Sequence, residues 1–322
     1  MRNAIDIVGV AHNGVTLQHL HQLILDAPSS PSEARSKEWA EHSFLVTCLE
    51  KAEAEIEAGR VSQKRHHDFA KAVQYFTKEY PGLSEKTRSI IVSSFTSMAD
   101  VLTRGEMHNL FCTGTNVFPE MSRHGHVLVL DLPIKKWGHT GRIAQLIFKY
   151  VWQKAMERGL SQDIKRPVFL WADEAQFFMS PYDMEFQTTV RSSKVSTVYL
   201  TQNLENYYAA IQEETRVKSI LSNLNTKIFH ANSDATTNEW ASGMIAKSMQ
   251  DNISHSNSDK EKSGISTNFS QELRSDVEPQ EFTRMRGGTD RNNKMVDAIL
   301  FQSGRIFSNG KTYLRIQFFQ EQ

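Results

Sequence analysis

The amino-acid sequence predicts an α/β fold, in which a parallel sheet with flanking helices follows an all-helical region. Residues 1–115 show helical periodicity and almost no strand pattern, whereas residues 116–322 alternate short apolar runs with helical segments. The apolar runs are continuous, which is typical of strands buried on both faces of a parallel sheet. We therefore expect an all-α domain over 1–115 and an α/β domain over 116–322.

The first 115 residues are predicted to form a series of capped helices. Thr16 can cap a helix with apolar residues on one face, and residues 38–59 are rich in good helix formers and end at Gly59. Ser84 can cap another helix, whose inward face is predicted to carry Ile90, Ile91, Phe95, Met98 and Leu102.

The second domain is predicted to alternate strands with helices, which favours a parallel, doubly wound sheet. The strands are expected at residues 126–133, 167–174, 196–203 and 226–232, and the helices at 140–159, 185–193, 210–221 and 233–249. Residues 251–271 are Ser-rich and polar, so we expect a mobile loop there. Two further strands, 294–302 and 312–319, flank Asn309-Gly310, a strong two-residue hairpin signal.

The composition narrows the function classes. Lys+Arg and Asp+Glu are equal at 37 each, so any nucleic-acid site must be local rather than a property of the whole surface. Cys48 and Cys112 lie far apart, which argues against a disulfide framework or a zinc knuckle and fits a reducing cytosol. The sequence shows neither a membrane-spanning apolar run nor a signal peptide, so a cytoplasmic chain is expected.

Polar residues follow two neighbouring predicted strands. Asp173 and Glu174 come after one apolar run, and Thr201 and Gln202 end the next. Because ligands of parallel sheets bind beyond the carboxyl ends of the strands, these tips can form one nucleotide site. Asp173 would hold the water shell of Mg²⁺ beside a phosphate, and Glu174 would polarise the attacking water. Gln202 would sense the γ-phosphate, with Thr201 beside the nucleotide. The alternative is an ordinary strand that runs into an acidic loop.

Two basic residues, Arg191 and Lys194, precede the Gln202 strand. Either can act as an arginine-finger-type cation on a neighbouring subunit, and a guanidinium spreads better over phosphate oxygens, which favours Arg191. The alternative is a solvated helix end, where cations favour the helix dipole.

Other features of the sequence bear on the same site. No G-x-x-x-x-G-K-[ST] phosphate loop occurs in the sequence, and "GMIAKS" at 243–248 has one glycine within a predicted helix. A basic cluster surrounds Gly287-Gly288; it can meet DNA phosphates or form a solvated loop, and it comprises Arg284, Arg286, Arg291 and Lys294.

Several stretches together resemble a known family. They include "RPVFLWADEAQFF", "RSSKVSTVYLTQNLENY", "NLNTKIFHANSDATTNEWAS" and "VEPQEFTRMRGG". The sequence is similar to the conjugative DNA-transfer ATPases of type IV secretion, the coupling proteins of the TraG/TraD type, over most of its length. In that family an all-helical domain is inserted between the phosphate-loop half and the acidic-strand half of the motor. The resemblance covers that helical insertion and the C-terminal part of the ATPase core, a partial P-loop (RecA-like) sheet.

The resemblance implies a function and partners. Asp173 and Glu174 fall on the family's Walker B positions, and Gln202 on its sensor glutamine. The resemblance implies ATP and Mg²⁺ as cofactors, a ring-shaped, hexameric motor, and single-stranded DNA, relaxase and type IV secretion components as partners. Full-length members are anchored at the inner membrane, with that anchor and the phosphate loop upstream. The alternatives are a non-catalytic DNA- or protein-binding module, or part of another P-loop translocase.

Overall fold

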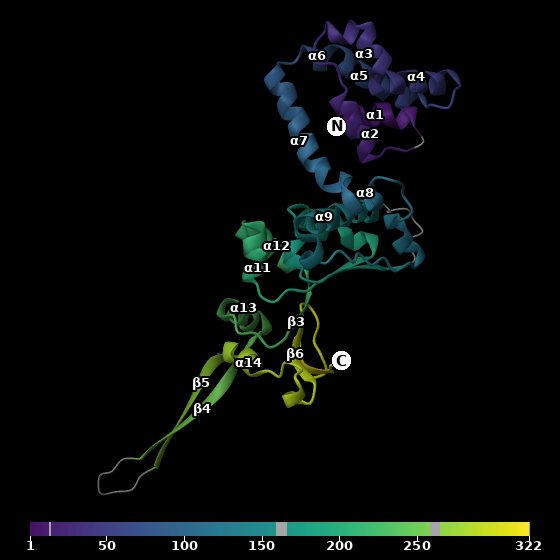
Figure 1. The fold of residues 1–322 in the computed structure, drawn as a ribbon. Coiled ribbons are helices and arrows are strands. Elements are labelled where there is room, and N and C mark those ends of the chain that lie inside the picture. Colours follow the sequence, from purple (N-terminus) through teal and green to yellow (C-terminus); the bar gives the residue numbers. More distant parts are fainter. Residues whose placement is uncertain (13, 159–165, 258–264, 322) are drawn as a thin grey trace. The chain divides into compact units, whose positions relative to one another are not determined.

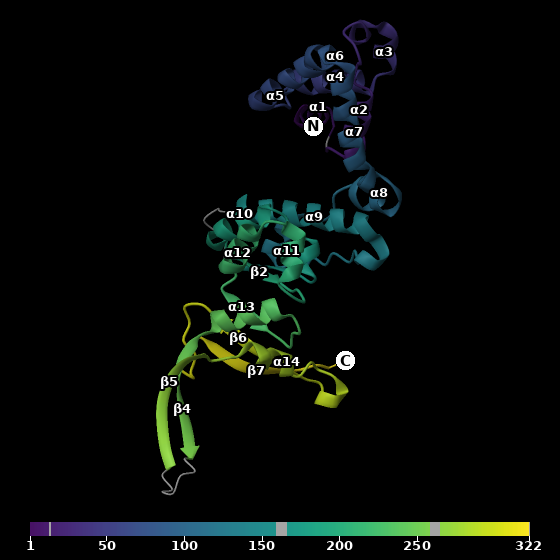
Figure 2. The same cartoon turned by 90° about the vertical axis from the view of Figure 1, so that its left-hand side faces the viewer.

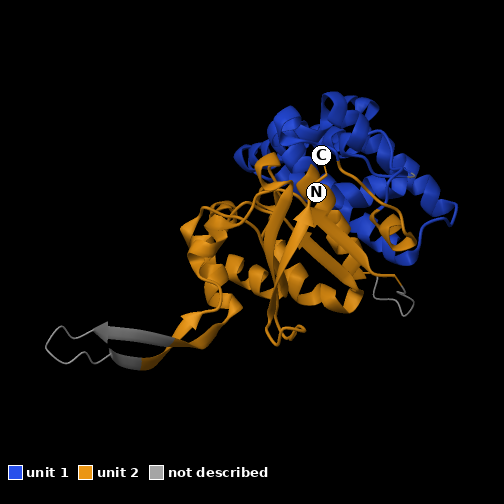
Figure 3. Cartoon of the chain, turned by 90° about the horizontal axis from the view of Figure 1, so that it is seen from below, with its two compact units in different colours: residues 1–118, 131–144 blue, residues 119–130, 145–322 orange. Residues whose placement is uncertain are grey.

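The computed structural model describes residues 1–12, 14–158, 166–257 and 265–321. It divides into two compact units, residues 1–118 with 131–144 and residues 119–130 with 145–322 (Figure 3). Each unit is described by itself. No helix in the described ranges is both long and apolar enough to cross a membrane.

The first unit is helical and has one apolar core (Figure 1). Thr16, Ser36, Ser43, Ser62 and Ser84 each accept a hydrogen bond from the backbone N–H three residues on, which caps the helix that follows. The predicted caps at Thr16 and Ser84 are therefore confirmed. The elements are α1 (Arg2–Ala11), α2 (Leu17–Leu25), η1 (Glu33–Arg35), α3 (Lys37–His42), α4 (Phe44–Glu57), α5 (Gln63–Gln74), η2 (Tyr75–Glu79), α6 (Tyr80–Gly82), α7 (Glu85–Thr103) and α8 (Gly105–Phe111).

The predicted inward face of α7 is only partly right. Phe95 and Leu102 are buried, whereas Ile90 and Met98 are exposed. The helical repeat places Ile90 and Met98 on one side of α7, but the other helices of this unit do not cover that side along its whole length.

The second unit contains three small sheets rather than one parallel sheet. Strands β1 (Val168–Ala172) and β2 (Val195–Tyr199) pair in parallel, with Val168 opposite Val195. Strands β3 (Thr226–Phe229), β6 (Met295–Gln302) and β7 (Tyr313–Phe319) form an antiparallel sheet in that order. The predicted α/β fold with a parallel sheet is confirmed in part by β1 and β2, but residues 226–232 were expected in that sheet and pair antiparallel with β6 instead, because hydrophobic runs locate strands without specifying their partners.

Helices flank these strands. They include α9 (Ile134–Arg158), broken at Gly138, α10 (Tyr182–Thr189), α11 (Glu205–Ile211), α12 (Glu214–Asn223), α13 (Ala235–Ile245) and α14 (Pro279–Arg284), with short 3₁₀ turns η3 (Pro119–His124), η4 (Ala175–Phe177), η5 (Val190–Ser193) and η6 (Asp290–Asn292). The buried apolar side chains of this unit fall into three clusters, under β1–β2, around α11–α12, and between α13 and the β3–β6–β7 sheet.

The predicted strand over 126–133 is not a strand in the structure. Residues 126–130 form no ladder with another strand, and Val127 and Val129 are 88% and 81% exposed. A groove of about 730 Å³ lies between this segment and β1. Strand propensity alone cannot make a strand, because each strand needs a neighbour for its backbone hydrogen bonds.

The predicted loop over 251–271 is also wrong within the described residues. Strands β4 (Lys247–Asn257) and β5 (Ile265–Ser275) form a long antiparallel hairpin (Figure 2). A polar sequence can form such a hairpin because the two strands satisfy each other's backbone groups without a core. The tip, residues 258–264, lies outside the described residues.

The C-terminal hairpin is confirmed, but its turn is longer than predicted. Strands β6 and β7 pair antiparallel, and residues 303–312 connect them. Asn309 and Gly310 lie in this connection, where Gly310 has a φ of 72° and Phe307 N–H donates to the Lys311 carbonyl. The left-handed backbone suits glycine.

Candidate nucleotide site

The carboxyl ends of β1 and β2 are joined by backbone hydrogen bonds. Leu200 N–H donates to the Ala172 carbonyl at 3.0 Å, and Ala175 N–H donates to the Leu200 carbonyl at 2.8 Å. The bonds fix the residues after β1 beside the residues after β2. The structure thus brings Glu174 and Gln202 together, from positions 28 residues apart in the sequence.

Glu174 is the centre of the polar contacts at these tips. Its Oε1 accepts a hydrogen bond from Gln202 Nε2 at 2.9 Å, and its Oε2 accepts one from Gln176 Nε2. Thr201 Oγ1 donates to Gln176 Oε1 at 2.9 Å, so both strand tips orient the same carboxylate. Asp173 Oδ1 accepts from the Glu174 N–H at 3.0 Å.

Glu174 has an unusual backbone conformation for its residue type. Its φ and ψ are 47° and 48°, in the left-handed region. A side chain with a Cβ pays about 1 kcal/mol for this conformation, which is tolerated where surrounding contacts enforce it. The strain coincides with the point where three polar side chains converge, so we regard it as part of the site.

The site is open to solvent and has few metal ligands. Asp173 and Gln202 are exposed, and Glu174 and Thr201 are half-buried. Within the described ranges no three His, Cys, Asp or Glu side chains are grouped so that they could hold a metal ion. Asp173 is the exposed carboxylate at these tips, and a carboxylate of this kind can hold Mg²⁺ through its water shell.

Two residues of this network escaped the sequence analysis. Gln176 orients Glu174, and Asn232 Nδ2 donates to the Gln202 carbonyl at 2.8 Å. Asn232 follows β3 in the same way as Gln202 follows β2. An amide side chain shortly after a third apolar run was therefore the signal in the sequence that could have identified Asn232. Gln176 carried no such signal, because its role depends on the turn that follows Glu174.

A buried ionic cluster lies at the end of β2. Lys149 Nζ contacts Asp183 Oδ2 at 2.6 Å, and Tyr199 OH donates to Asp183 Oδ1 at 2.6 Å. Gln153 Nε2 donates to the same carboxylate at 2.9 Å, and Lys149 also donates to the Phe178 carbonyl. The cluster attaches the last residue of β2 to α9 and α10.

Burial and the attraction between the two charges act in opposite directions on the pKa of each member of this ion pair. Burial lowers the pKa of Lys149, and the adjacent Asp183 opposes that change. Burial works to raise the pKa of Asp183, but the Lys149 cation and the surrounding hydrogen bonds outweigh it, so the net pKa is lowered. Burial, with the Asp183 charge, raises the pKa of Tyr199 well above its usual value, so Tyr199 stays a neutral donor.

The predicted cations Arg191 and Lys194 lie elsewhere. Arg191 is in η5, and Lys194, with a φ of 51°, directly precedes β2. Both are therefore at the end of β2 opposite Gln202, so within one chain neither belongs to the Glu174 network.

The predicted basic cluster around Gly287-Gly288 is only partly free. Arg286 makes two side-chain hydrogen bonds to the Asp297 carboxylate, at 2.9 and 2.7 Å. Arg284 and Arg291 are exposed. Arg286 therefore stabilises the antiparallel sheet through its ion pair with Asp297 on β6, whereas Arg284 and Arg291 are exposed and can contact phosphate.

Three comparisons relate the chain to known proteins. Residues 167–287 match the family described as "TraM recognition site of TraD and TraG". No match was found among curated proteins. Among solved structures, the chain is similar to the unbound bacterial conjugative coupling protein TrwBdeltaN70, with 12% identity and a TM-score of 0.48 over 98% of this chain and 66% of that one.

Two further matches are to the plasmid coupling protein TrwB. One is the complex with the non-hydrolysable GTP analogue GDPNP, with 14% identity and a TM-score of 0.45 over 98% of this chain and 68% of that one. The other is the complex with the ATP analogue ADPNP, with 13% identity, a TM-score of 0.43 and the same coverage. The chain thus spans about two thirds of the TrwB chains. Residues 167–287 are therefore similar to the TraD and TraG family that the sequence resemblance named.

Proposed function

We propose that the chain supplies the acidic half of the nucleotide site of a conjugative DNA-transfer motor with a RecA-like core. The hydrogen bond of 2.9 Å between Gln202 Nε2 and Glu174 Oε1 carries this proposal, because it joins the two strand tips into one polar site. The family match over 167–287 covers both tips and supports it.

Each side chain has a distinct role in the proposed site. With Mg²⁺·ATP bound, the exposed Asp173 carboxylate would hold the water shell of the ion. Glu174 would accept a proton from water as the water oxygen bonds to the γ-phosphorus and the bond to the ADP leaving group breaks, and Gln202 would orient that carboxylate and sense the γ-phosphate. Thr201 holds Gln176 against the same carboxylate. The phosphate cradle must come from a polypeptide segment with a G-x-x-x-x-G-K-[ST] loop, which this sequence lacks.

The assembled motor is proposed to be a ring of identical subunits that passes single-stranded DNA with its relaxase to a type IV secretion channel. In a ring, Arg191 of one subunit can reach the nucleotide of the next, which suits its position away from the Glu174 network of its own chain.

A mating assay tests the proposed function. Glu174→Gln keeps the size of the side chain but removes its charge and replaces one of its two acceptor oxygens by a donor, so transfer of the element that encodes the chain should fall at least about 100-fold. Glu205→Gln is the matched control, because Glu205 is exposed on α11 next to the site. Wild-type transfer by the Glu174→Gln strain would refute catalysis and leave a binding module.

The purified chain should not hydrolyse ATP. Without a phosphate cradle, Asp173 and Glu174 cannot bind the triphosphate tightly enough for turnover. Phosphate release measured with wild-type protein and with Glu174→Gln should equal background in both. Turnover that Glu174→Gln abolishes would show that the chain contains a complete site.

The purified chain should also bind single-stranded DNA weakly and lose it as salt rises. Contacts to phosphates release counterions, and each contributes a slope of about −0.7 in a plot of log affinity against log salt. Replacing both Arg284 and Arg291 by alanine should flatten this slope, whereas Arg158→Ala, at another exposed position, should not. A slope near zero for the wild type would contradict phosphate binding.

A further inference from the structure

Gln202 lies in the short connection between β2 and α11. One neighbouring segment forms hydrogen bonds to this connection at two points, Gln202 and Leu204. Asn232 Nδ2 donates to the carbonyl of Gln202 at 2.8 Å. Thr237 Oγ1 accepts the N–H of Leu204 at 2.9 Å. Both partners come from the stretch that follows β3 and forms the first turn of α13.

This holding segment is itself fixed by internal hydrogen bonds. Asp234 caps α13 by accepting the Thr237 N–H at 2.8 Å and its hydroxyl at 2.5 Å. The Asn232 side-chain oxygen accepts the Asp234 N–H at 2.8 Å, so the Asn232 amide can present its NH₂ to Gln202 in one orientation. Asn238, only 3% exposed, donates to the Asn232 carbonyl at 3.0 Å. The segment is therefore a rigid support.

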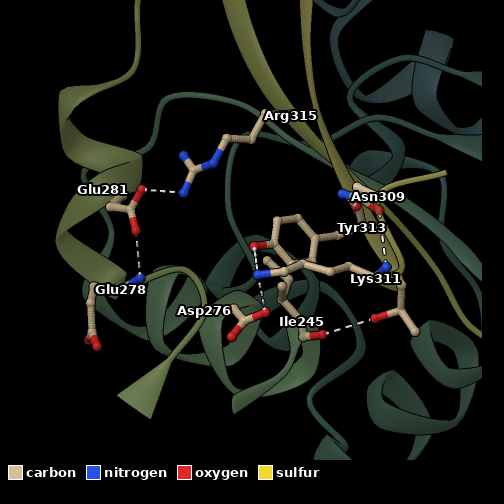
Figure 4. A network of polar contacts seen from close by, with 9 residues as sticks. Ile245, Asp276, Glu278, Glu281, Asn309, Lys311, Tyr313 and Arg315 are labelled. Carbon is tan, nitrogen blue, oxygen red and sulfur yellow. Dashed lines mark hydrogen bonds and ion pairs between the residues drawn. The ribbon is translucent and has the colours of Figure 1, made fainter. Parts of the chain in front are cut away.

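The other end of α13 is fastened by different residues. Thr312 Oγ1 donates to the Ile245 carbonyl at 3.1 Å, and Asp276 N–H donates to the Ala246 carbonyl at 3.0 Å. Lys311 pairs with Asp276 at 2.8 Å in the same region (Figure 4). Because α13 is anchored at both ends, its first turn cannot shift to follow Gln202.

We propose that Asn232 and Thr237 are positioning residues that set Gln202 against Glu174. Fixing the Gln202 carbonyl and the Leu204 N–H restricts the backbone from which the Gln202 side chain extends. Gln202 is exposed, so its bond to Glu174 competes with water and depends on this restriction. The significance of the arrangement rests on the proposed function, since Glu174 and Gln202 are its catalytic pair. The positioning itself needs no nucleotide.

Nuclear magnetic resonance of the full chain, labelled with ¹⁵N-glutamine, tests this inference. The side-chain amide of Gln202, identified by its loss in Gln202→Ala, should show an Overhauser contact with the Glu174 side chain. Asn232→Ala and Thr237→Val should each abolish that contact. Thr237→Ser keeps the hydroxyl and should retain it.

The control is Ser242→Ala. Ser242 lies on the same helix as Thr237, and the substitution removes its hydrogen bond of 2.6 Å to the Val277 carbonyl. It should lower the melting temperature without loss of the Gln202–Glu174 contact, and so separates positioning from general helix stability. If Thr237→Val does not fold, Asn232→Ala alone tests the proposal, because Asn232 is only half-buried and its replacement should leave the chain folded. Retention of the contact in a folded Asn232→Ala chain would overturn the proposal. Because no measurement involves ATP or DNA, this outcome is independent of the mating result.

Discussion

The helical unit and the sheet-bearing unit differ in how their apolar side chains are buried and in how their backbone hydrogen bonds are made. In the helical unit most of the buried apolar residues form one cluster, and hydroxyl side chains cap five of the helices. In the sheet-bearing unit the core is split into three clusters, and large apolar side chains such as Phe169 and Trp171 stay exposed on β1. A helix satisfies its backbone within itself, whereas a strand depends on its neighbours.

The difference extends to the role of polar residues. In the helical unit five hydroxyl side chains act as caps three residues from their partners, and Asp26 also joins distant residues by accepting a hydrogen bond from Ser43 Oγ. In the sheet-bearing unit they act between distant elements, as in the contact of Lys149 with Asp183 and of Gln202 with Glu174. Substitutions in the two units should therefore differ in size and in how far their effects spread.

The largest effect is expected for Asp183→Ala. It leaves the Lys149 cation buried without its partner, which should cost about 3–5 kcal/mol. Hydrogen–deuterium exchange should accelerate in β1, β2 and α10 and stay unchanged in α1 and α4. Replacing Lys149 by Met and Asp183 by Leu together should recover part of the loss. Equal acceleration in both units would contradict their independence.

Leu23→Ala is the corresponding test in the helical unit. Leu23 is fully buried, so the cavity should cost about 2–5 kcal/mol. Exchange should accelerate in α1, α2 and α4 and leave β1 and β2 as they are. Leu25→Ala is the matched control, because Leu25 is on the same helix and exposed, and it should be close to neutral.

A smaller effect is expected for Ser84→Ala. The loss of the cap on α7 should reduce the free energy of unfolding by about 1 kcal/mol, and Ser84→Asp should retain the cap. Urea unfolding measures both. A loss as large as that of Leu23→Ala would show that the helical unit also depends on long-range polar contacts.

The smallest effect concerns acid stability of the antiparallel sheet. The Arg286 side chain and backbone hold the pKa of Asp297 down to about 2, from the ordinary 3.8. A depressed carboxyl pKa stabilises the fold above the unfolded value, and this contribution is lost as pH falls through the folded value. The melting-temperature difference between wild type and Asp297→Asn should be constant above about pH 4 and shrink toward pH 2. A difference that is constant down to pH 2 would exclude the ion pair as its source.

Local signals in the sequence predicted local structure. The caps at Thr16 and Ser84 and the positions of β1, β2 and β3 followed from residue type and periodicity. Strand pairing was not predictable. Residues 126–133 were expected to be a strand, but they pair with no strand among the described residues, and residues 251–271 were expected to be a loop, but their described part belongs to a hairpin. In both cases the result depends on hydrogen bonds to another segment.

The candidate site shows the same division between features that local sequence predicts and contacts between distant segments that it does not predict. The sequence placed Glu174 and Gln202 at neighbouring strand tips, and the structure joins them. It did not indicate Asn232, Thr237 or the Lys149–Asp183 pair, because those contacts connect residues about 30 positions apart. Their catalytic and positioning roles remain proposals that the experiments above decide.

The left-handed backbone of Glu174 has a consequence for protein engineering. A glycine or asparagine there would adopt the same conformation at lower cost, so either substitution should stabilise the fold slightly. Either would also delete the carboxylate on which Gln176 and Gln202 converge. A selection for thermostability alone would therefore favour variants at position 174 that are more stable and lack the carboxylate of the proposed catalytic site, so stability and the proposed activity place opposite demands on this residue.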